Sequence, residues 1–313
     1  MSRRGLFLFV AMCVIWGIPY LLIRVAVGEI SPAMLVFVRT GVGALILAPL
    51  VLARGGPLAI GSRWPWLLAF AAIEVGAPWF FLSSAEQHLT SALAALLIAA
   101  VPLVGAVIAA AFGNREHFGR ASLSGLLLGL AGVGLIVGFN LRASDVTAVL
   151  EMAVVVVGYA LGPAILARYL TGIPSVTVIG SALALCAVVY APFAIATWPH
   201  HVPSAGALAS LAVLAVVCTA VAFLLFFALI AEVGPVRSTV ITYVNPAVAA
   251  VAGFAVLHES LTAPMVLGFG LVIAGSVLST RRRKAAPTAR VDEAGAPGSR
   301  REHREEAVEQ PLG

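Results

Sequence analysis

Long apolar runs separated by short polar breaks dominate the chain between Gly5 and Thr280. Each run holds about 20 residues, which in a helix rising about 1.5 Å per residue cross about 30 Å of hydrocarbon. Runs such as LALCAVVYAPFAIA are apolar on every side and lack the alternation of membrane β-strands. The pattern predicts an all-α integral membrane protein with ten transmembrane helices. They are expected at residues 5–27, 32–53, 64–84, 90–112, 121–139, 147–169, 174–198, 205–231, 236–257 and 262–280.

Composition makes the lipid bilayer the solvent of most of the chain. Hydrophobic residues make up 61% and charged residues 11%, and the mean hydropathy is +1.05. Soluble domains are roughly half apolar and a quarter charged, and the short loops leave no room for one here. After Lys284 the sequence changes to Ala, Pro, Gly, Arg and Glu, which cannot bury enough apolar surface to fold. We therefore expect residues 281–313 to form a disordered cytoplasmic tail.

Basic residues set the expected orientation, because Lys and Arg that flank spans are retained on the cytoplasmic side. An even number of helices puts both termini on one side. With both termini cytoplasmic, only Arg24 and Arg142 fall on the outer side. The formal charge of +5 then reflects membrane topology and gives no reason to expect nucleic acid binding. The inner basic residues are Arg3, Arg4, Arg54, Arg63, Arg115, Arg120, Arg168, Arg237, Arg281, Arg282, Arg283 and Lys284.

Two halves of the chain share a glutamate and two glycines at the same spacing, with a proline just upstream of each set. In each half the glycines follow the glutamate by 9 and 16 positions, which indicates a duplication. The first repeat is expected at residues 5–139 and the second at 147–280. Five helices per repeat is an odd number, so the repeats are predicted to be inverted in the membrane. The landmarks are Pro102, Glu116, Gly125 and Gly132, and then Pro246, Glu259, Gly268 and Gly275.

A series of short motifs carries a resemblance to a known family. In order they are Trp16-Gly17, Arg24, Pro32, Arg39, the segment AEQHLTSALAALLIAAVPLVGAVIAA, Tyr159-Ala160, the segment YVNPAVAAVAG, and the Glu259-to-Gly275 ending. Together they resemble the EamA-type branch of the drug/metabolite transporter superfamily over residues 5 to 280. The resemblance implies a ten-helix bundle with a central cavity in a bacterial-type inner membrane, and often export of amino acids or related metabolites.

Two positions depart from that family. The loop that usually reads Gly-Glu is Asn114-Arg115-Glu116 in the first copy and His258-Glu259 in the second. Small multidrug relatives place an essential Glu in their first helix, and this first helix has none. Drug–proton antiport by that mechanism is therefore not expected.

Glu74 is an ionisable residue expected deep in the third helix, roughly 15 Å from its start. A charge at the bilayer centre costs on the order of 3 kcal/mol. An ionisable residue there is therefore expected to pair with another group, to face a cavity or to serve a function. We interpret it as a proton carrier or as the partner of a cationic substrate group. The alternative is a structural Glu bonded to a neighbouring helix.

Arg39 is expected roughly 10 Å below the surface, too deep for a freely hydrated guanidinium. It would bind a substrate carboxylate or phosphate, or pair with Glu74 if the two helices are adjacent. The family resemblance instead favours a fixed structural role. Arg24, nearer the outer interface, is interpreted as a snorkelling anchor.

Aromatic and polar residues inside helices complete the predicted substrate site, because Tyr and Trp combine an apolar body with a hydrogen-bond donor. Ordinary helix packing is the alternative for each of them. Trp64, Trp66 and Trp198 lie at helix ends and are interpreted as interface anchors. The predicted substrate-binding set is Trp16, Tyr20, Arg39, Glu74, Trp79, Tyr159, Tyr243 and Asn245.

Other residues receive structural interpretations. Pro19, Pro78, Pro102, Pro163 and Pro246 interrupt spans as hinges or static kinks. Glu116 and Glu259 are expected to cap helix N-termini or close turns. Glu86-Gln87-His88 and His200-His201 are expected to be exposed in outer loops, and Cys13, Cys186 and Cys218 to be free thiols. Small residues are expected to allow close helix contact, with a homodimer seam as one use; they are Gly129, Gly132, Gly268, Gly270 and Gly275.

The sequence therefore predicts a secondary transporter that exports a small metabolite by alternating access, with proton coupling through Glu74. Its expected partners are the small-molecule substrate and the lipid bilayer, and no cofactor, metal or nucleic acid is expected. A lipid or lipid-linked sugar flippase is the main alternative. A membrane enzyme is disfavoured because His258-Glu259 lacks the second His of HExxH, and the chain has no GxxxxGK[ST] loop for an ATP-driven pump.

Overall fold

The computed structural model describes residues 2–111, 120–140, 145–234, 238 and 240–280. Within these ranges every regular element is a helix and none is a strand, so the prediction of an all-α protein is confirmed. Seven helical segments of the described residues are long and apolar enough to cross a membrane, and three shorter apolar helices accompany them. The count of ten spans stays a prediction. The predicted cap Glu116, its neighbours Asn114 and Arg115, and the predicted tail lie outside the described residues.

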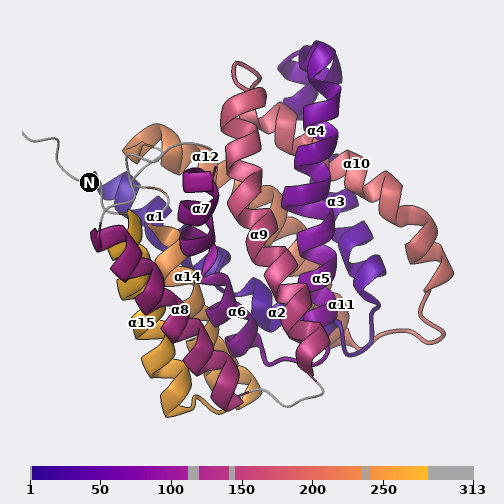
Figure 1. Cartoon of the computed structure of the whole chain (residues 1–313). Helices are drawn as coiled ribbons and strands as arrows, with labels where there is room; N and C mark the ends of the chain where they lie inside the picture. The colour runs from indigo at the N-terminus through magenta and orange to yellow at the C-terminus, as the bar shows by residue number, and fades with distance from the viewer. Residues whose placement is uncertain (1, 112–119, 141–144, 235–237, 239, 281–313) are drawn as a thin grey trace, which may run out of the picture. The chain divides into compact units, whose positions relative to one another are not determined.

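Figure 1 shows the helices and their order. The first half forms α1 (Arg3–Ile15), α2 (Pro19–Ala26), α3 (Pro32–Ala53), η1 (Gly56–Arg63), α4 (Trp64–Phe70), η2 (Ala71–Gly76), α5 (Ala77–Ala85), α6 (Ser91–Ile98), α7 (Val101–Ala111) and α8 (Arg120–Asn140). The second half forms α9 (Val146–Tyr169), α10 (Ser175–Ala196), α11 (Ala205–Ala215), η5 (Val216–Val221), α12 (Ala222–Val233), α14 (Ile241–Leu257) and α15 (Ala263–Thr280).

Several apolar runs are divided into shorter helices. The run at 5–27 is broken between α1 and α2, where Pro19, which has no backbone N–H, begins the second piece. Pro102 likewise stands at the start of α7. In contrast, Pro163 and Pro246 lie inside the continuous helices α9 and α14. Whether any of these prolines acts as a hinge stays a prediction.

Two runs contain a π-helical segment, η2 between α4 and α5 and η5 between α11 and α12. A π turn shifts the hydrogen-bond ladder by one residue, which needs other donors for the carbonyls it releases. In η2 the Cys186 thiol donates to the Ala71 carbonyl at 3.4 Å, and the Tyr190 hydroxyl donates to the Gly76 carbonyl at 3.0 Å. Both donors belong to α10, so α10 holds η2 in this form.

Helices far apart in the sequence pack in pairs. The pairs are α1 with α12, α2 with α11, α3 with α10, α5 with α9, α6 with α14 and α8 with α15. Figure 1 shows α8 and α15 side by side. Every pair joins an element from the first half to one from the second half, so the two halves form one common core.

Glycines bring α8 and α15 into backbone contact. A Cβ added to Gly132 would lie 2.6 Å from the Gly268 carbonyl oxygen, and one added to Gly275 would lie 2.5 Å from the Gly125 carbonyl oxygen. Only glycine fits at such distances. The close contact expected of Gly129, Gly132, Gly268 and Gly275 is thus made inside the chain. Gly270 makes no such contact, because an added Cβ there would meet nothing within 4 Å. A homodimer stays a prediction.

Candidate functional site

Arg39 of α3 is buried, with 6% of its surface exposed. Its Nε donates a hydrogen bond to the Thr219 hydroxyl at 2.9 Å, and its guanidinium carbon lies 3.7 Å from the centroid of the Trp79 ring. A cation over the face of an indole is attracted by the ring quadrupole, most strongly where water is excluded. Arg39 therefore joins three elements, α3, η5 and α5.

Thr219 lies in the second π-helical segment and is fully buried. Its hydroxyl donates to the Leu214 carbonyl at 2.8 Å while it accepts the hydrogen bond from Arg39. The hydroxyl thereby supplies the donor that the π turn requires and the acceptor that the buried guanidinium requires. Sequence reasoning did not single out Thr219, because a lone Thr within VVCTAVAF is common in apolar helices.

Two tyrosines complete the group around Arg39. Tyr20 of α2 is buried and Tyr159 of α9 is half-buried, and both interact electrostatically with Arg39. Trp79 also interacts with the Tyr159 side chain. We call Tyr20, Arg39, Trp79, Tyr159 and Thr219 the polar cluster. Four of the eight residues predicted for the substrate site thus come together, from four different helices.

Glu74 lies in η2, beside the polar cluster, and interacts electrostatically with Tyr159. Its Oε2 atom is buried and has no hydrogen-bond partner. The carboxyl packs against Gly162 of α9, where an added Cβ would lie 2.7 Å from the Glu74 Cδ. No ion pair with Arg39 is present among the described residues, so the two predicted charges occupy separate positions.

The remaining predicted site residues lie elsewhere. Trp16 packs against Phe223 and Phe226 of α12, with ring centroids 5.9 and 4.7 Å away. Asn245 is buried, and its amide is assigned the orientation in which its nitrogen donates to the Cys13 and Ile241 carbonyls, at 3.2 and 2.9 Å. These contacts fit the alternative interpretation of ordinary helix packing. Tyr243 is half-buried near the start of α14.

The loop after α5 differs from expectation. Gln87 and His88 are exposed as predicted, but the prediction that Glu86 is exposed is wrong, because none of its surface is accessible. Both of its carboxyl oxygens lack a hydrogen-bond partner. The Arg24 Nη1 donates to the backbone carbonyls of Glu86 and Gln87 at 2.5 and 3.1 Å, which ties its guanidinium to this loop. Its role as a snorkelling anchor stays a prediction. Glu86 differs from the adjacent Gln87 and His88 only in being buried, and a single sequence does not show which loop residue is buried.

Glu259 has the opposite surroundings. Its carboxyl accepts hydrogen bonds from the Ser91 amide, the Ser91 hydroxyl and the Ala92 amide at 2.8, 2.9 and 3.0 Å. These amides are among the unpaired donors at the N-terminus of α6. Glu259 therefore caps this helix across the two halves, in the structural role predicted for it.

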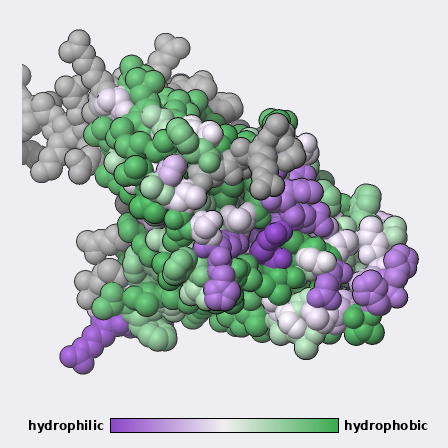
Figure 2. Space-filling view, turned by 90° about the horizontal axis from the view of Figure 1, so that it is seen from below, coloured by the Kyte–Doolittle hydropathy of each residue, from purple (hydrophilic) through white to green (hydrophobic). Residues whose placement is uncertain are grey.

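The loops containing Glu29, Glu86 and Glu259 lie at one end of the molecule, because hydrogen bonds join them to neighbouring loops and helix starts. Figure 2 looks at this end, where hydrophilic residues gather in the middle and on one side and hydrophobic residues surround them. Such a distribution fits an end that meets water inside a ring of lipid-facing side chains.

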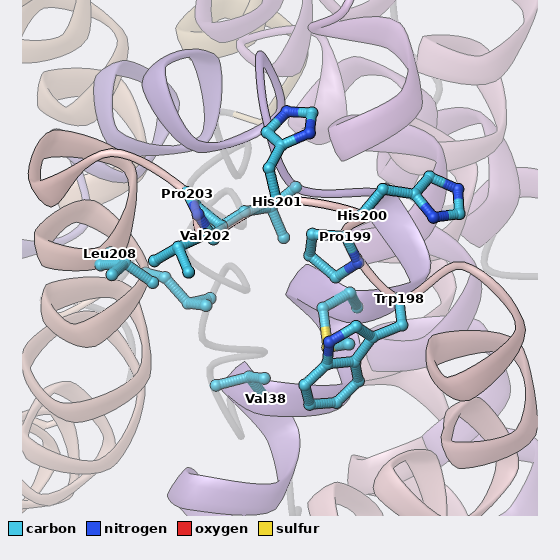
Figure 3. Close-up of a pocket in the computed structure, with 11 residues that line it drawn as sticks. Val38, Trp198, Pro199, His200, His201, Val202, Pro203 and Leu208 are labelled. Atoms are coloured by element: carbon cyan, nitrogen blue, oxygen red, sulfur yellow. The ribbon is translucent and has the colours of Figure 1, made fainter.

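A pocket of about 450 Å³ opens near the loop that joins α10 to α11. Figure 3 shows Val38, Trp198 and Leu208 around the space, whereas the imidazoles of His200 and His201 point away from it. Its walls are apolar, and it contains no residue of the polar cluster. It is therefore a feature separate from the polar cluster.

Comparisons with known proteins agree with this arrangement. The model of the EamA-like transporter family matches residues 3–138 and 146–281. The chain is 23% identical over 294 residues to the Uncharacterized transporter YvbV of Bacillus subtilis strain 168, covering 93% of this chain and 96% of that protein. It is 25% identical over 283 residues to the Uncharacterized inner membrane transporter YedA of Escherichia coli strain K12, covering 86% and 88%.

A solved crystal structure of another protein has the same fold. It matches with a TM-score of 0.63 and 21% sequence identity, covering 90% of this chain and 97% of that chain. Together with the apolar helices, the family match and the two named relatives identify a multi-pass membrane protein of transporter type.

Proposed function

Because the chain belongs to the EamA-like transporter family, we propose that it is a secondary transporter that exports a small metabolite across the inner membrane by alternating access. Both termini are cytoplasmic in this proposal. An amino acid or a related amphipathic compound is the proposed substrate class. Family membership favours transport over a membrane-embedded enzyme.

The observation that carries this proposal is the polar cluster. It places a guanidinium, two phenols and an indole among apolar helices, where polar groups are costly and mark substrate pathways. The Nε of Arg39 is occupied by Thr219, so the terminal nitrogens of the guanidinium would hold a substrate carboxylate. Tyr20 and Trp79 would provide apolar faces for the rest of the molecule.

Contacts across the two halves support an inverted repeat. Glu259, Gly268 and Gly275 each lie 143 positions after Glu116, Gly125 and Gly132, so Gly268 corresponds to Gly125, and Gly275 to Gly132. The contact between Gly132 and Gly268 is then equivalent to the contact between Gly125 and Gly275. Reciprocal contacts of this kind are what a two-fold axis produces. Such an axis in the membrane plane would give two packings of similar energy, as alternating access requires.

Proton coupling through Glu74 is part of the proposal. A buried carboxyl oxygen without a hydrogen bond is costly when the group is charged, so a bound proton would compensate in this conformation. The residue sits in a π-helical segment, a feature that is frequent at functional sites. Its interaction with Tyr159 would connect a change in protonation to the polar cluster.

Lipid or lipid-linked sugar translocation is the second candidate. It is favoured by the apolar pocket, in which Met34, Val38, Leu208 and Leu211 would contact an acyl chain. No residue of the polar cluster would be needed for that activity.

Reconstitution into liposomes tests the proposal. We expect saturable flux of radiolabelled amino acids and related metabolites that responds to a proton gradient and is abolished in Glu74→Gln. Glu232→Gln is the matched control, because Glu232 is exposed and its carboxyl accepts a hydrogen bond from Ser2. Gradient-insensitive flux that survives Glu74→Gln would remove Glu74 as the carrier. Movement of a labelled lipid between leaflets, without metabolite flux, would support the second candidate.

A further inference from the structure

Glu86 is a carboxyl that no feature of the fold explains. It follows Ala85, the last residue of α5, and none of its surface is accessible. Neither carboxyl oxygen has a hydrogen-bond partner. Burying a charged group without partners costs several kcal/mol in general, whereas Leu or Met at this position would pack at no such cost. A charged Glu86 would therefore lower the stability of the fold, so a purely structural role does not explain it.

Five charged or titratable groups among the described residues interact electrostatically with Glu86. They are Tyr20 and Arg24 of α2, Arg39 of α3, Tyr159 of α9 and Glu259 of the loop between α14 and α15. The hydrogen bonds of the two arginines go to other groups: the Arg24 Nη1 donates to the backbone carbonyls of Glu86 and Gln87, and the Arg39 Nε donates to Thr219. Neither one pairs with the carboxyl of Glu86, whose oxygens stay without a partner.

The carboxyl therefore needs a cation that is not part of the protein. Because none of its surface is accessible, this conformation leaves no room for an ion or a substrate ammonium group. A proton needs no room. Glu86 lies just beyond the apolar segment Gly56–Ala85, and burial raises the pKa of its carboxyl well above the usual range. Glu259 adds to this rise in pKa, while Arg24 and Arg39 oppose it.

We propose that Glu86 is a proton-binding site at the end of the molecule that carries the loop 86–90, and that it titrates as this end opens and closes. The proposal rests on the transporter function proposed above. When the end closes, a proton from water adds to one carboxylate oxygen and the neutral acid is buried. When it opens, water reaches the group and the proton leaves, without any electron transfer or co-reactant.

The charge of Glu86 interacts electrostatically with three residues of the polar cluster, Tyr20, Arg39 and Tyr159. Tyr159 interacts electrostatically with Arg39, Glu74 and Glu86, so a change of charge on either carboxyl acts on the same tyrosine as the guanidinium does. A negative charge at Glu86 would attract the Arg39 guanidinium, and this attraction would lower the affinity of Arg39 for a substrate anion. Glu74 lies deeper in the span and Glu86 at its end, so the two carboxyls would load and release protons at different depths.

Infrared difference spectra of the purified full-length protein in lipid nanodiscs test the site directly. As pH rises, we expect a protonated-carboxyl band that disappears with a midpoint well above about 4.3, the value of a free Glu. Glu86→Gln should lose this component, and Glu232→Gln should keep it. Glu86→Asp, which retains a carboxyl in a shifted position, should keep the band with a changed midpoint. A Glu86→Gln spectrum identical to that of the wild type would overturn the proposal.

Flux measurements test the coupling with radiolabelled amino acids as the probe. Across a gradient of one pH unit, coupling to one proton allows about tenfold accumulation. Glu86→Gln should abolish this accumulation while it keeps exchange of labelled for unlabelled amino acid at equal pH. Retained accumulation would overturn the coupling. If the wild type moves no amino acid, the transport proposal fails for this substrate class, and the infrared band alone decides whether Glu86 binds a proton.

Discussion

The two segments that match the family model share their scaffold but not their charges. Each has a π-helical segment in a long apolar run, η2 in the first and η5 in the second. Each contributes glycines to the contact between α8 and α15. The first half nevertheless carries Arg39, Glu74 and Glu86, whereas η5 of the second half carries the neutral Thr219.

This difference separates residues that hold the fold from residues that serve a function. Thr219 has both of its hydrogen-bond needs met, by Arg39 and by the Leu214 carbonyl. Glu74, in the other π-helical segment, has a buried oxygen with no partner. Polar groups whose hydrogen bonds are all made rigidify a core, while a buried ionisable group without a hydrogen-bond partner calls for a bound ion, a proton or a second conformation. Substitutions at features that both halves share, such as the glycine contact, should therefore lower stability. Substitutions of the charged residues that only the first half carries, Arg39, Glu74 and Glu86, should affect transport.

The largest effect on stability is expected at a shared feature, the glycine contact between α8 and α15. In Gly132→Ala the new Cβ would lie 2.6 Å from the Gly268 carbonyl oxygen and 2.8 Å from the Val272 nitrogen. Backbone atoms cannot step aside as side chains do, so we expect a loss on the order of 3 kcal/mol in the free energy of unfolding. The apparent Tm in detergent, followed by tryptophan fluorescence, measures it.

Gly134→Ala is the matched control for this prediction. It lies on the same helix, and an added Cβ there would meet nothing within 4 Å. Since Ala favours a helix over Gly by about 1 kcal/mol, this variant should be neutral or slightly stabilised. Equal Tm losses in both variants would show that the backbone contact is not what makes Gly132 necessary.

A smaller effect is expected at Thr219, where the halves differ. Thr219→Val keeps the shape but removes the acceptor of Arg39 and the donor to the Leu214 carbonyl. Leaving buried polar groups unpaired should cost about 2 kcal/mol, again measured as a fall in Tm. Thr177→Val in α10 is the control, because the buried Thr177 hydroxyl has no hydrogen-bond partner to lose. A larger loss in Thr177→Val than in Thr219→Val would contradict this account.

The helices and the family could be predicted from the sequence more fully than the candidate site. The predicted helix at 32–53 coincides with α3, because length and hydropathy alone set it. The family match confirms the resemblance that short motifs had indicated. Tyr20, Arg39, Trp79 and Tyr159 were predicted as site residues, and the structure brings them together. Whether they bind a substrate stays a prediction.

Contacts between segments far apart in the chain could not be predicted from the sequence. A pair of Arg39 with Glu74 had seemed attractive because both are charged, yet Arg39 instead contacts Thr219, 180 positions away. Trp16 and Asn245 have the residue types of a binding site, but they pack α1 against α12 and α14. Glu86 looked like a loop residue and is buried. Residue type indicates what a side chain can do, whereas its neighbours decide what it does.

The smallest expected effect concerns a loop contact between the halves. The exposed carboxyl of Glu29 accepts hydrogen bonds from the Ser204 amide, at 2.7 Å, and from its hydroxyl, at the N-terminus of α11. These bonds hold the pKa of Glu29 below its usual range. A lowered pKa in the folded state means that the contact stabilises the loop at neutral pH and ceases to do so as pH falls through that pKa.

Hydrogen exchange at residues 204–208 checks this contact when the wild type is compared with Glu29→Gln at each pH. At neutral pH the wild type should exchange more slowly than Glu29→Gln, because a carboxylate is the stronger acceptor for the helix-start donors. The difference should shrink as pH falls and the Glu29 carboxylate is protonated. A difference that persists undiminished in acid would mean that the charge of Glu29 is irrelevant.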